Sequence, residues 1–101
     1  MELRQLITFS KITHLKSFMK AAENLGYAQS TITTQIKLLE KELGIKLFEK
    51  IGRNMELTSK GLIFLEYAEK IINLANEAKE AIDDRDTPKG TLKIGRSEER
   101  R

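Results

Sequence analysis

A stretch of the chain without carboxylates contains the first residues whose types and spacing could do chemistry. No Asp or Glu occurs between Glu23 and Glu40, although 33% of all residues are charged. The polar side chains of this stretch that repeat at helical spacing are Gln29, Ser30, Thr33, Thr34 and Lys37. Amide and hydroxyl groups can hydrogen-bond to base edges in the DNA major groove, where a carboxylate would be repelled by the phosphates. The alternative interpretation is a solvated helix face that is neutral by chance.

A second group of polar and basic residues surrounds a Gly-bearing turn over residues 51–54. The flanking segments, 45–50 and 55–58, predict two short strands and therefore a hairpin, or wing. An arginine at a hairpin tip can enter a narrow minor groove, where the negative potential is enhanced. The DNA contacts predicted here are Lys50, Arg53 and Asn54. The alternative is an ordinary charged turn.

Other residue sets that carry chemistry are missing from the sequence. Cysteine is absent, which excludes a disulfide framework, a thiolate metal site and a cysteine nucleophile. His14 is the only histidine and has no clustered carboxylates beside it in the sequence, so we predict no metal, no cofactor and no catalytic site. We therefore expect a protein that is not an enzyme.

Three short helices must position the polar face. Apolar residues recur three and four positions apart over residues 2–12, 18–25 and 28–43. Segment 13–16 is expected to break the first helix and Ser17 to cap the second, while Gly26 and Gly44 should end the second and third. Two short helices joined by a Gly-containing turn form a helix-turn-helix.

A fourth, longer helix is predicted from Thr58 or Ser59 to about Asp84, roughly 39 Å at 1.5 Å per residue. One apolar stripe with coiled-coil spacing consists of Phe64, Tyr67, Ile71, Leu74, Ala78 and Ala81. A second stripe beside it consists of Leu65, Ala68, Ile72, Ala75 and Ile82. So wide an apolar face needs more cover than a small domain offers. We predict that part of it packs on its own domain and that the first stripe pairs with a second chain.

Charge is segmented along the chain. Residues 1–60 carry ten Lys or Arg against six Asp or Glu, and residues 61–86 carry three against seven. A basic first segment suits a polyanion binder, because each neutralised phosphate releases counterions. No segment approaches the roughly 20 apolar residues that span a bilayer, and no signal peptide is apparent. We expect a soluble, cytoplasmic protein without a membrane partner.

The expected architecture is mainly α. Residues 1–58 should form a winged helix-turn-helix of three helices and a short β-hairpin, and residues 59–86 a long dimerisation and linker helix. Pro88 and Gly90, residue types that interrupt helices and strands, follow this helix. Residues 87–101 are therefore expected to be a linker and the truncated start of a further domain.

Several motifs in one register carry a resemblance to a known family. They are Ser17-Phe18, Ala21-Ala22, Leu25, Gln29-Ser30, Gln35-Ile36, Leu39-Glu40, the run from Leu43 to Lys50, Arg53, Leu57-Thr58 and Gly61. This combination closely resembles the N-terminal domain of LysR-type transcriptional regulators. The likeness runs from Met1 to about Gly95, where the segment from Gly90 resembles the start of that family's effector-binding domain.

The resemblance implies a homodimer, often paired into a tetramer, that binds an interrupted dyad of double-stranded DNA near promoters and activates or represses transcription. It implies base contacts from Gln29, Ser30, Thr33 and Thr34, and a minor-groove contact from Arg53. Many members have Pro in place of Ser30 and Arg in place of Thr34, which changes the operator that is read rather than the activity. The family's ligand-sensing domain is missing from this sequence, so no small-molecule effector is expected for this chain.

Two alternatives stay open. An interaction module would dimerise through the long helix and pair with, or sequester, a full-length regulator, and it would bind dyad DNA no better than random duplex. A MarR-like winged helix is the nearest rival fold, but the stretch from Gln29 to Glu40 fits the LysR-type pattern better.

Overall fold

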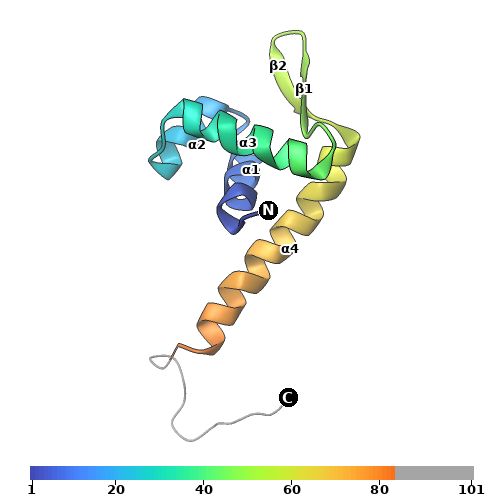
Figure 1. Cartoon of the computed structure of the whole chain (residues 1–101). Helices are drawn as coiled ribbons and strands as arrows, with labels where there is room; N and C mark the ends of the chain where they lie inside the picture. Colours follow the sequence, from blue (N-terminus) through green and yellow to red (C-terminus); the bar gives the residue numbers. More distant parts are fainter. Residues whose placement is uncertain (84–101) are drawn as a thin grey trace, which may run out of the picture.

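The computed structural model describes residues 1–83, which form four helices and one hairpin (Figure 1). The elements are α1 Leu3–Leu15, α2 Phe18–Leu25, α3 Gln29–Leu43, β1 Phe48–Ile51, β2 Asn54–Leu57 and α4 Ser59–Ala81. The first three helices pack together as a head, from which the hairpin and α4 extend in different directions. The predicted mainly α winged helix-turn-helix with a long following helix is confirmed. The predicted linker and domain start at 87–101 lie outside the described residues.

Local hydrogen bonds set the ends of α2 and α3 where the sequence predicts them. The Ser17 side chain accepts a hydrogen bond from the Lys20 N–H at 3.0 Å and so caps α2. Gly26 and Gly44 end α2 and α3 with φ angles of +77° and +70°. This left-handed conformation suits glycine because it has no Cβ.

The predicted break over residues 13–16 is wrong, because α1 continues to Leu15. The Thr13 hydroxyl donates to the Phe9 carbonyl within the helix. Leu15 is partly buried against the core, so its burial favours the additional helical turn. Lys16 then ends the helix in the left-handed region, at φ +57°.

One apolar core joins the head to the base of the wing and to α4. Its fully buried side chains include Phe9, Leu6, Ile12, Ile32, Leu39 and Leu47. The Phe48 ring lies edge-on to both Phe9 and Phe18, with ring centroids 5.5 Å apart in each pair. Such pairs contribute about 0.5–1.5 kcal/mol beyond area burial. Since Phe48 begins β1, the base of the wing is fixed to α1 and α2.

The wing is a two-stranded antiparallel hairpin in which Ile51 pairs with Asn54. Only Gly52 and Arg53 therefore make the turn, and Gly52 takes φ +63°, as the first central residue of a type II′ turn requires. The prediction of a four-residue turn is wrong, because Ile51 and Asn54 extend the ladder.

The prediction that the first strand begins at Ile45 is also wrong. The segment before β1 is held by side-chain hydrogen bonds and by one backbone hydrogen bond, from the Thr58 N–H to the Leu47 carbonyl. The Leu47 N–H donates to the Glu40 carboxylate at 2.8 Å. The Thr58 hydroxyl donates to the Lys46 carbonyl at 2.6 Å. These contacts between distant residues cannot be read from local strand patterning.

Thr58 joins the wing to the start of α4. Its hydroxyl accepts a hydrogen bond from the Gly61 N–H at 2.9 Å, which caps the helix. Its own N–H donates to the Leu47 carbonyl at 3.0 Å. Gly61 lies so close that an added Cβ would be 2.4 Å from this carbonyl oxygen. The orientation of α4 therefore depends on a close backbone approach at its first turn.

Helix α4 has 23 residues, a length of about 35 Å, and ends at Ala81 instead of the predicted Asp84. Acidic residues near this end oppose the negative end of the helix dipole, and Asp is a weak helix former. Helix α4 is still the longest of the helices within residues 1–83. No helix within residues 1–83 is long and apolar enough to cross a membrane.

One side of α4 packs on α1 through the second apolar stripe, except at Ile82, which follows the helix and is 81% exposed. Ala68 is fully buried, and Leu65 and Ile72 are partly buried against the core. Beside them, the Glu69 carboxylate accepts a hydrogen bond from Ser10 and contacts His14. The hydrogen bond from His14 lowers the pKa of Glu69 below its ordinary value, and Ser10 acts in the same direction. This polar contact fixes α1 to the middle of α4.

Candidate nucleic-acid interface

The outer face of α3 carries all five side chains that were predicted on this helix to bind DNA. Gln29, Ser30, Thr34 and Lys37 are exposed, and their side chains form no hydrogen bond or ion pair with the rest of residues 1–83. Thr33 is half-buried and its hydroxyl donates to the Gln29 carbonyl at 3.1 Å. Four of the five side chains are therefore available to a partner as they stand.

The opposite face of α3 explains why these residues point outward. Ile32, Ile36 and Leu39 are buried in the core, and residues three and four apart share one side of a helix. The N-cap residue Ala28 makes no side-chain hydrogen bond to the first turn. The first backbone N–H groups of α3 are therefore left to solvent or a partner, at the positive end of the helix dipole.

The strand register separates the predicted wing residues. Alternate residues share a face of a strand, so Lys50 lies with Met55 and Phe48 on the face toward α3. Asn54 lies on the other face, with the directly opposed pair Glu49 and Glu56. Two carboxylates on that face would repel phosphates, so it is the less favourable side for DNA.

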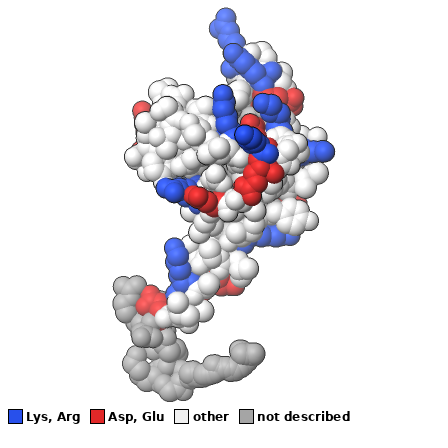
Figure 2. All heavy atoms as spheres, in the orientation of Figure 1, with Lys and Arg blue, Asp and Glu red and all other residues white. Residues whose placement is uncertain are grey.

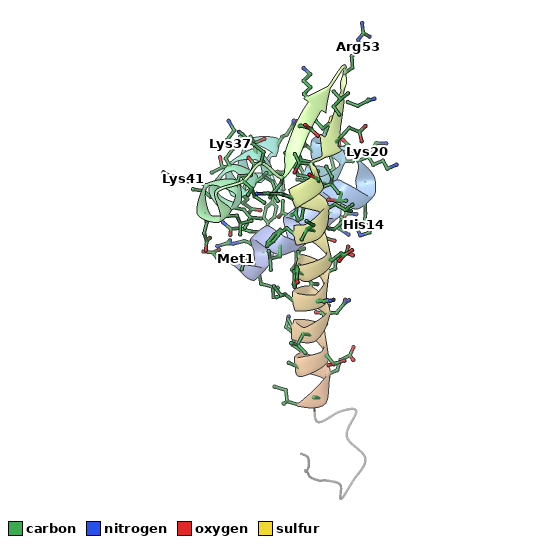
Figure 3. All side chains as sticks on the ribbon, turned by 90° about the vertical axis from the view of Figure 1, so that its right-hand side faces the viewer. Met1, His14, Lys20, Lys37, Lys41 and Arg53 are labelled. Carbon is green, nitrogen blue, oxygen red and sulfur yellow. The ribbon has the colours of Figure 1, made fainter. Side chains whose placement is uncertain are left out.

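Arg53 stands apart from both faces. It is the second residue of the turn, is exposed, and extends from the tip of the wing away from the helices (Figure 3). Its side chain makes no ion pair within residues 1–83. A free guanidinium at the most distant point of the head is suited to reach a second groove or a phosphate.

A groove of about 550 Å³ connects the outer face of α3 with the wing. Three of the predicted residues line it, namely Gln29, Thr33 and Lys37. Its apolar wall comes from Phe18, Met19, Ile36, Phe48 and Met55. The other predicted residues do not line this groove, namely Ser30, Thr34, Lys50, Arg53 and Asn54. The structure thus brings one part of the predicted set together and leaves the others on the outer surface.

Lys and Arg side chains gather over the wing and, with acidic side chains among them, over the C-terminal half of α3, while the part of the head formed by α2 and the start of α3 is mostly uncharged (Figure 2). Lys41, which is not among the predicted residues, follows Lys37 by one helical turn and is exposed (Figure 3). A second groove, of about 460 Å³, is lined by Lys37, Lys41 and Lys46 and by one carboxylate, that of Glu40. The four-residue spacing of Lys37 and Lys41 was the signal that could have identified this basic surface.

The first apolar stripe of α4 is largely exposed. Tyr67 is 58% and Leu74 64% exposed, and Ile71 is 39% exposed. Ala78 and Ala81 are exposed as well. These five predicted dimerisation residues lie on one side of the helix without cover from the described chain.

Phe64 departs from this prediction. Its ring packs on Phe9 with centroids 5.7 Å apart, so it belongs to the core of its own chain. Heptad spacing places Phe64 in line with Tyr67, but on a helix of 3.6 residues per turn it lies only about 40° from the buried Ala68. Ile63, 59% exposed, occupies the outer position instead. The signal for Ile63 was its place four residues before Tyr67.

Comparison with known proteins shows a family match over most of the head. The family model described as bacterial regulatory helix-turn-helix protein, lysR family, matches residues 3–62. The HTH-type transcriptional regulator YwqM of Bacillus subtilis (strain 168), which is described as uncharacterized, is 49% identical over 98 residues. That alignment covers 97% of this chain and 33% of YwqM, so the chain spans about a third of the relative's length.

Solved structures agree with the sequence match. The DNA-binding domain of CbnR in complex with DNA superposes with a TM-score of 0.75 at 38% identity, covering 80% of this chain and 93% of that one. The DNA-binding domain of BenM in complex with the catB site 1 DNA gives 0.75 at 39% identity, covering 79% and 86%. By sequence and by fold, the chain belongs to the LysR family of bacterial regulatory helix-turn-helix proteins.

Proposed function

We propose that this chain is the DNA-binding part of a transcription regulator, with α3 in the major groove and the wing at the minor groove of double-stranded DNA. The observation that carries the proposal is the exposed outer face of the N-terminal half of α3, which has no carboxylate before Glu40 and where Gln29, Ser30 and Thr34 have unpaired donors and acceptors. The solved CbnR and BenM domains that it resembles are bound to DNA. We propose that it acts in the cytoplasm without catalytic activity of its own, as relatives described as transcriptional regulators suggest.

Replacing Gln29 by Ala is expected to relax base preference at one half-site position, at a cost of about 1–3 kcal/mol against the preferred sequence. The fold should be unaffected because the side chain is exposed. Fluorescence anisotropy with the preferred duplex and its single-base variants measures the effect. Thr31→Ala is the matched control, since Thr31 is exposed on the same helix but about 200° around its axis. Equal discrimination in the parent and Gln29→Ala would remove this residue from base reading.

Replacing Arg53 by Ala is expected to weaken binding to all duplexes evenly and to reduce the salt slope by about one unit, as for the loss of one phosphate or minor-groove cation. Affinities at several salt concentrations give the slope. Lys79→Ala is the control, because Lys79 lies in the last turn of α4, far from the wing. If the Arg53→Ala slope matched that of the parent, the wing would be ordinary structure.

We propose further that two copies pair through one apolar seam of α4. The seam consists of Ile63, Tyr67, Ile71, Leu74, Ala78 and Ala81. Large exposed apolar side chains that continue along one helix face are typical of an interface. The cover that the described chain lacks would come from the same face of a second copy, as in a symmetric dimer. Pairing into tetramers would need surfaces beyond this seam.

Charge along one flank of the seam favours antiparallel pairing. Glu66, Lys70 and Glu77 are exposed on this flank, within about 40° of one another around the axis. Parallel helices in register would place this flank on opposite sides of the seam in the two copies, where its charges do not meet. Antiparallel helices set Lys70 against Glu77 of the other copy, twice by symmetry. The two heads would then lie at opposite ends of helices about 35 Å long, close to the roughly 34 Å repeat between half-sites on one face of DNA.

Selection of bound duplexes from a random pool, followed by sequencing, tests the proposal as a whole. A recovered interrupted dyad is the expected result, and it would give the operator at the same time. A protein that forms dimers but binds selected and random duplexes equally would instead be an interaction module that pairs with a full-length regulator.

A further inference from the structure

A buried hydroxyl connects α1 with the helix proposed to read bases. Thr8 in α1 is fully buried, at 0% exposure. Its hydroxyl donates to the Gln35 side-chain oxygen in α3 at 2.6 Å, across 27 positions of sequence. Within residues 1–83 the only other buried polar side chain is Gln5, which serves the capping box at the start of α1. Thr8 therefore has no comparable role within its own helix.

The Thr8 hydroxyl is confined to this partner for an energetic reason. A buried donor without a partner loses its full solvation and costs about 1–3 kcal/mol. The short Oγ1 to Oε1 distance is within the range of a well-formed O–H···O bond. The bond thus holds the Gln35 side chain against α1, and the backbone of α3 with it.

Gln35 occupies a position that can set the roll of α3, which is the rotation of the helix about its own axis. It is half-buried on the side of α3 that contacts α1, about 60° around the helix axis from the buried Ile32 and about 100° from Thr34. Each residue of a helix is turned by about 100° from the one before, so holding Gln35 toward α1 directs Ser30 and Thr34 outward. The main neighbours of α3 are α1 and α2 (Figure 1).

Apolar contacts alone would fix the roll less closely. Ile32, Ile36 and Leu39 hold α3 on the core, but apolar burial is non-directional. A hydrogen bond weakens steeply as its angle departs from linear. Base recognition depends on positions within about 0.5 Å and on angles within about 10–20°. A directional contact at Gln35 meets this requirement where packing does not.

We propose that Thr8 is a positioning residue for base recognition: through Gln35 it sets the roll of α3, and thereby the discrimination between base pairs, without touching DNA. This inference rests on the proposed DNA-binding function. It extends the set of residues that determine specificity from the surface of α3 to the interior of α1.

The test measures discrimination, defined as the ratio of the Kd for a single-base variant to the Kd for the selected duplex. Thr8→Val removes the hydroxyl and keeps the branched shape, and it should lower this ratio about three- to tenfold, as expected for one hydrogen bond. Affinity for random duplex should change less than about twofold, because the cationic side chains of Lys37 and Arg53, which would attract any duplex, are unchanged. Thr8→Ser keeps the hydroxyl and should restore discrimination to that of the parent.

Two further variants separate positioning from stability. Ile12→Val shortens another buried side chain of α1 and is expected to cost about 0.5–1.5 kcal/mol, so it should lower Tm with no change in discrimination. Gln35→Met should lower discrimination as Thr8→Val does, and the double variant no further, since both remove the same bond. If Thr8→Val fails to fold, Gln35→Met and Thr8→Ser still decide the question.

The proposal would be overturned if both Thr8→Val and Gln35→Met kept the parent's discrimination and only lowered Tm, as Ile12→Val does. DNA binding by the parent would not be affected by that result. A parent that selects no preferred duplex would overturn the proposed function itself. The two failures are therefore distinguishable in one set of measurements.

Discussion

A Leu74→Glu protein is expected to stay folded, to sediment mainly as a monomer, and to lose most of its affinity for a duplex with two half-sites. Leu74 is 64% exposed in the single chain, so the glutamate disturbs nothing within one copy. In the proposed dimer it would bury an unpaired charge in each half of the seam, at a cost of several kcal/mol per charge. Affinity for a single half-site should change much less. Sedimentation gives the mass, and anisotropy on both duplexes gives the affinities.

Asn76→Glu is the matched control for this experiment. Asn76 is exposed two residues further along α4, but about 160° away around the axis, on the side opposite the seam. This variant adds the same charge and should remain dimeric with parental binding. A dimeric Leu74→Glu protein, or a monomeric one that binds the full dyad as tightly as the parent, would show that the seam does not couple the two heads.

Replacing Gly61 by Ala is expected to destabilise the protein by about 3 kcal/mol, which lowers Tm by roughly 15 °C for a domain of this size. The sign is opposite to helix propensity, by which Ala stabilises a helix interior by roughly 0.5–1 kcal/mol relative to Gly. The new Cβ would lie 2.4 Å from the Leu47 carbonyl oxygen and 3.1 Å from Thr58 Oγ1. That carbonyl belongs to the backbone and already accepts a hydrogen bond from the Thr58 N–H, so it cannot easily move away from the new Cβ.

Thermal unfolding followed by circular dichroism measures the effect of Gly61→Ala. Lys60→Ala is the control, because Lys60 is exposed in the same helical turn and its replacement should change Tm little. A Gly61→Ala protein with an unchanged or raised Tm would show that the backbone before the wing can shift at a small cost in free energy. The proposed coupling of wing and α4 through this approach would then be wrong.

Local chemistry made much of the head predictable from sequence. Ser17 caps α2 and Thr58 caps α4 through side-chain oxygens that reach backbone N–H groups three residues on. Gly26 and Gly44 end their helices because a left-handed residue without Cβ is needed there. The outward face of α3 followed from the 3.6-residue period alone. Each of these features depends on a few neighbouring residues, so the sequence contains its full cause.

Features that depend on contacts between distant residues were decided by the tertiary structure. Burial of Leu15 prolongs α1, and the hydrogen bond from Leu47 to Glu40 replaces a predicted strand. Packing on Phe9 moves Phe64 into the core and leaves Ile63 on the outer seam. In each case the local pattern permits two arrangements of similar free energy, and burial against a remote segment selects one.

The interface shows the same division. Residue types on α3 and at the wing tip indicated nucleic-acid chemistry without any structure. The strand register, which sets Lys50 and Asn54 on opposite faces of the wing, became visible only when the turn length was known, because one residue of shift exchanges the two faces of a strand. The bond from Thr8 to Gln35 joins two helices whose relative orientation no local pattern specifies. The sequence by itself determined which groups are available to a partner, and tertiary packing decided how they are aimed.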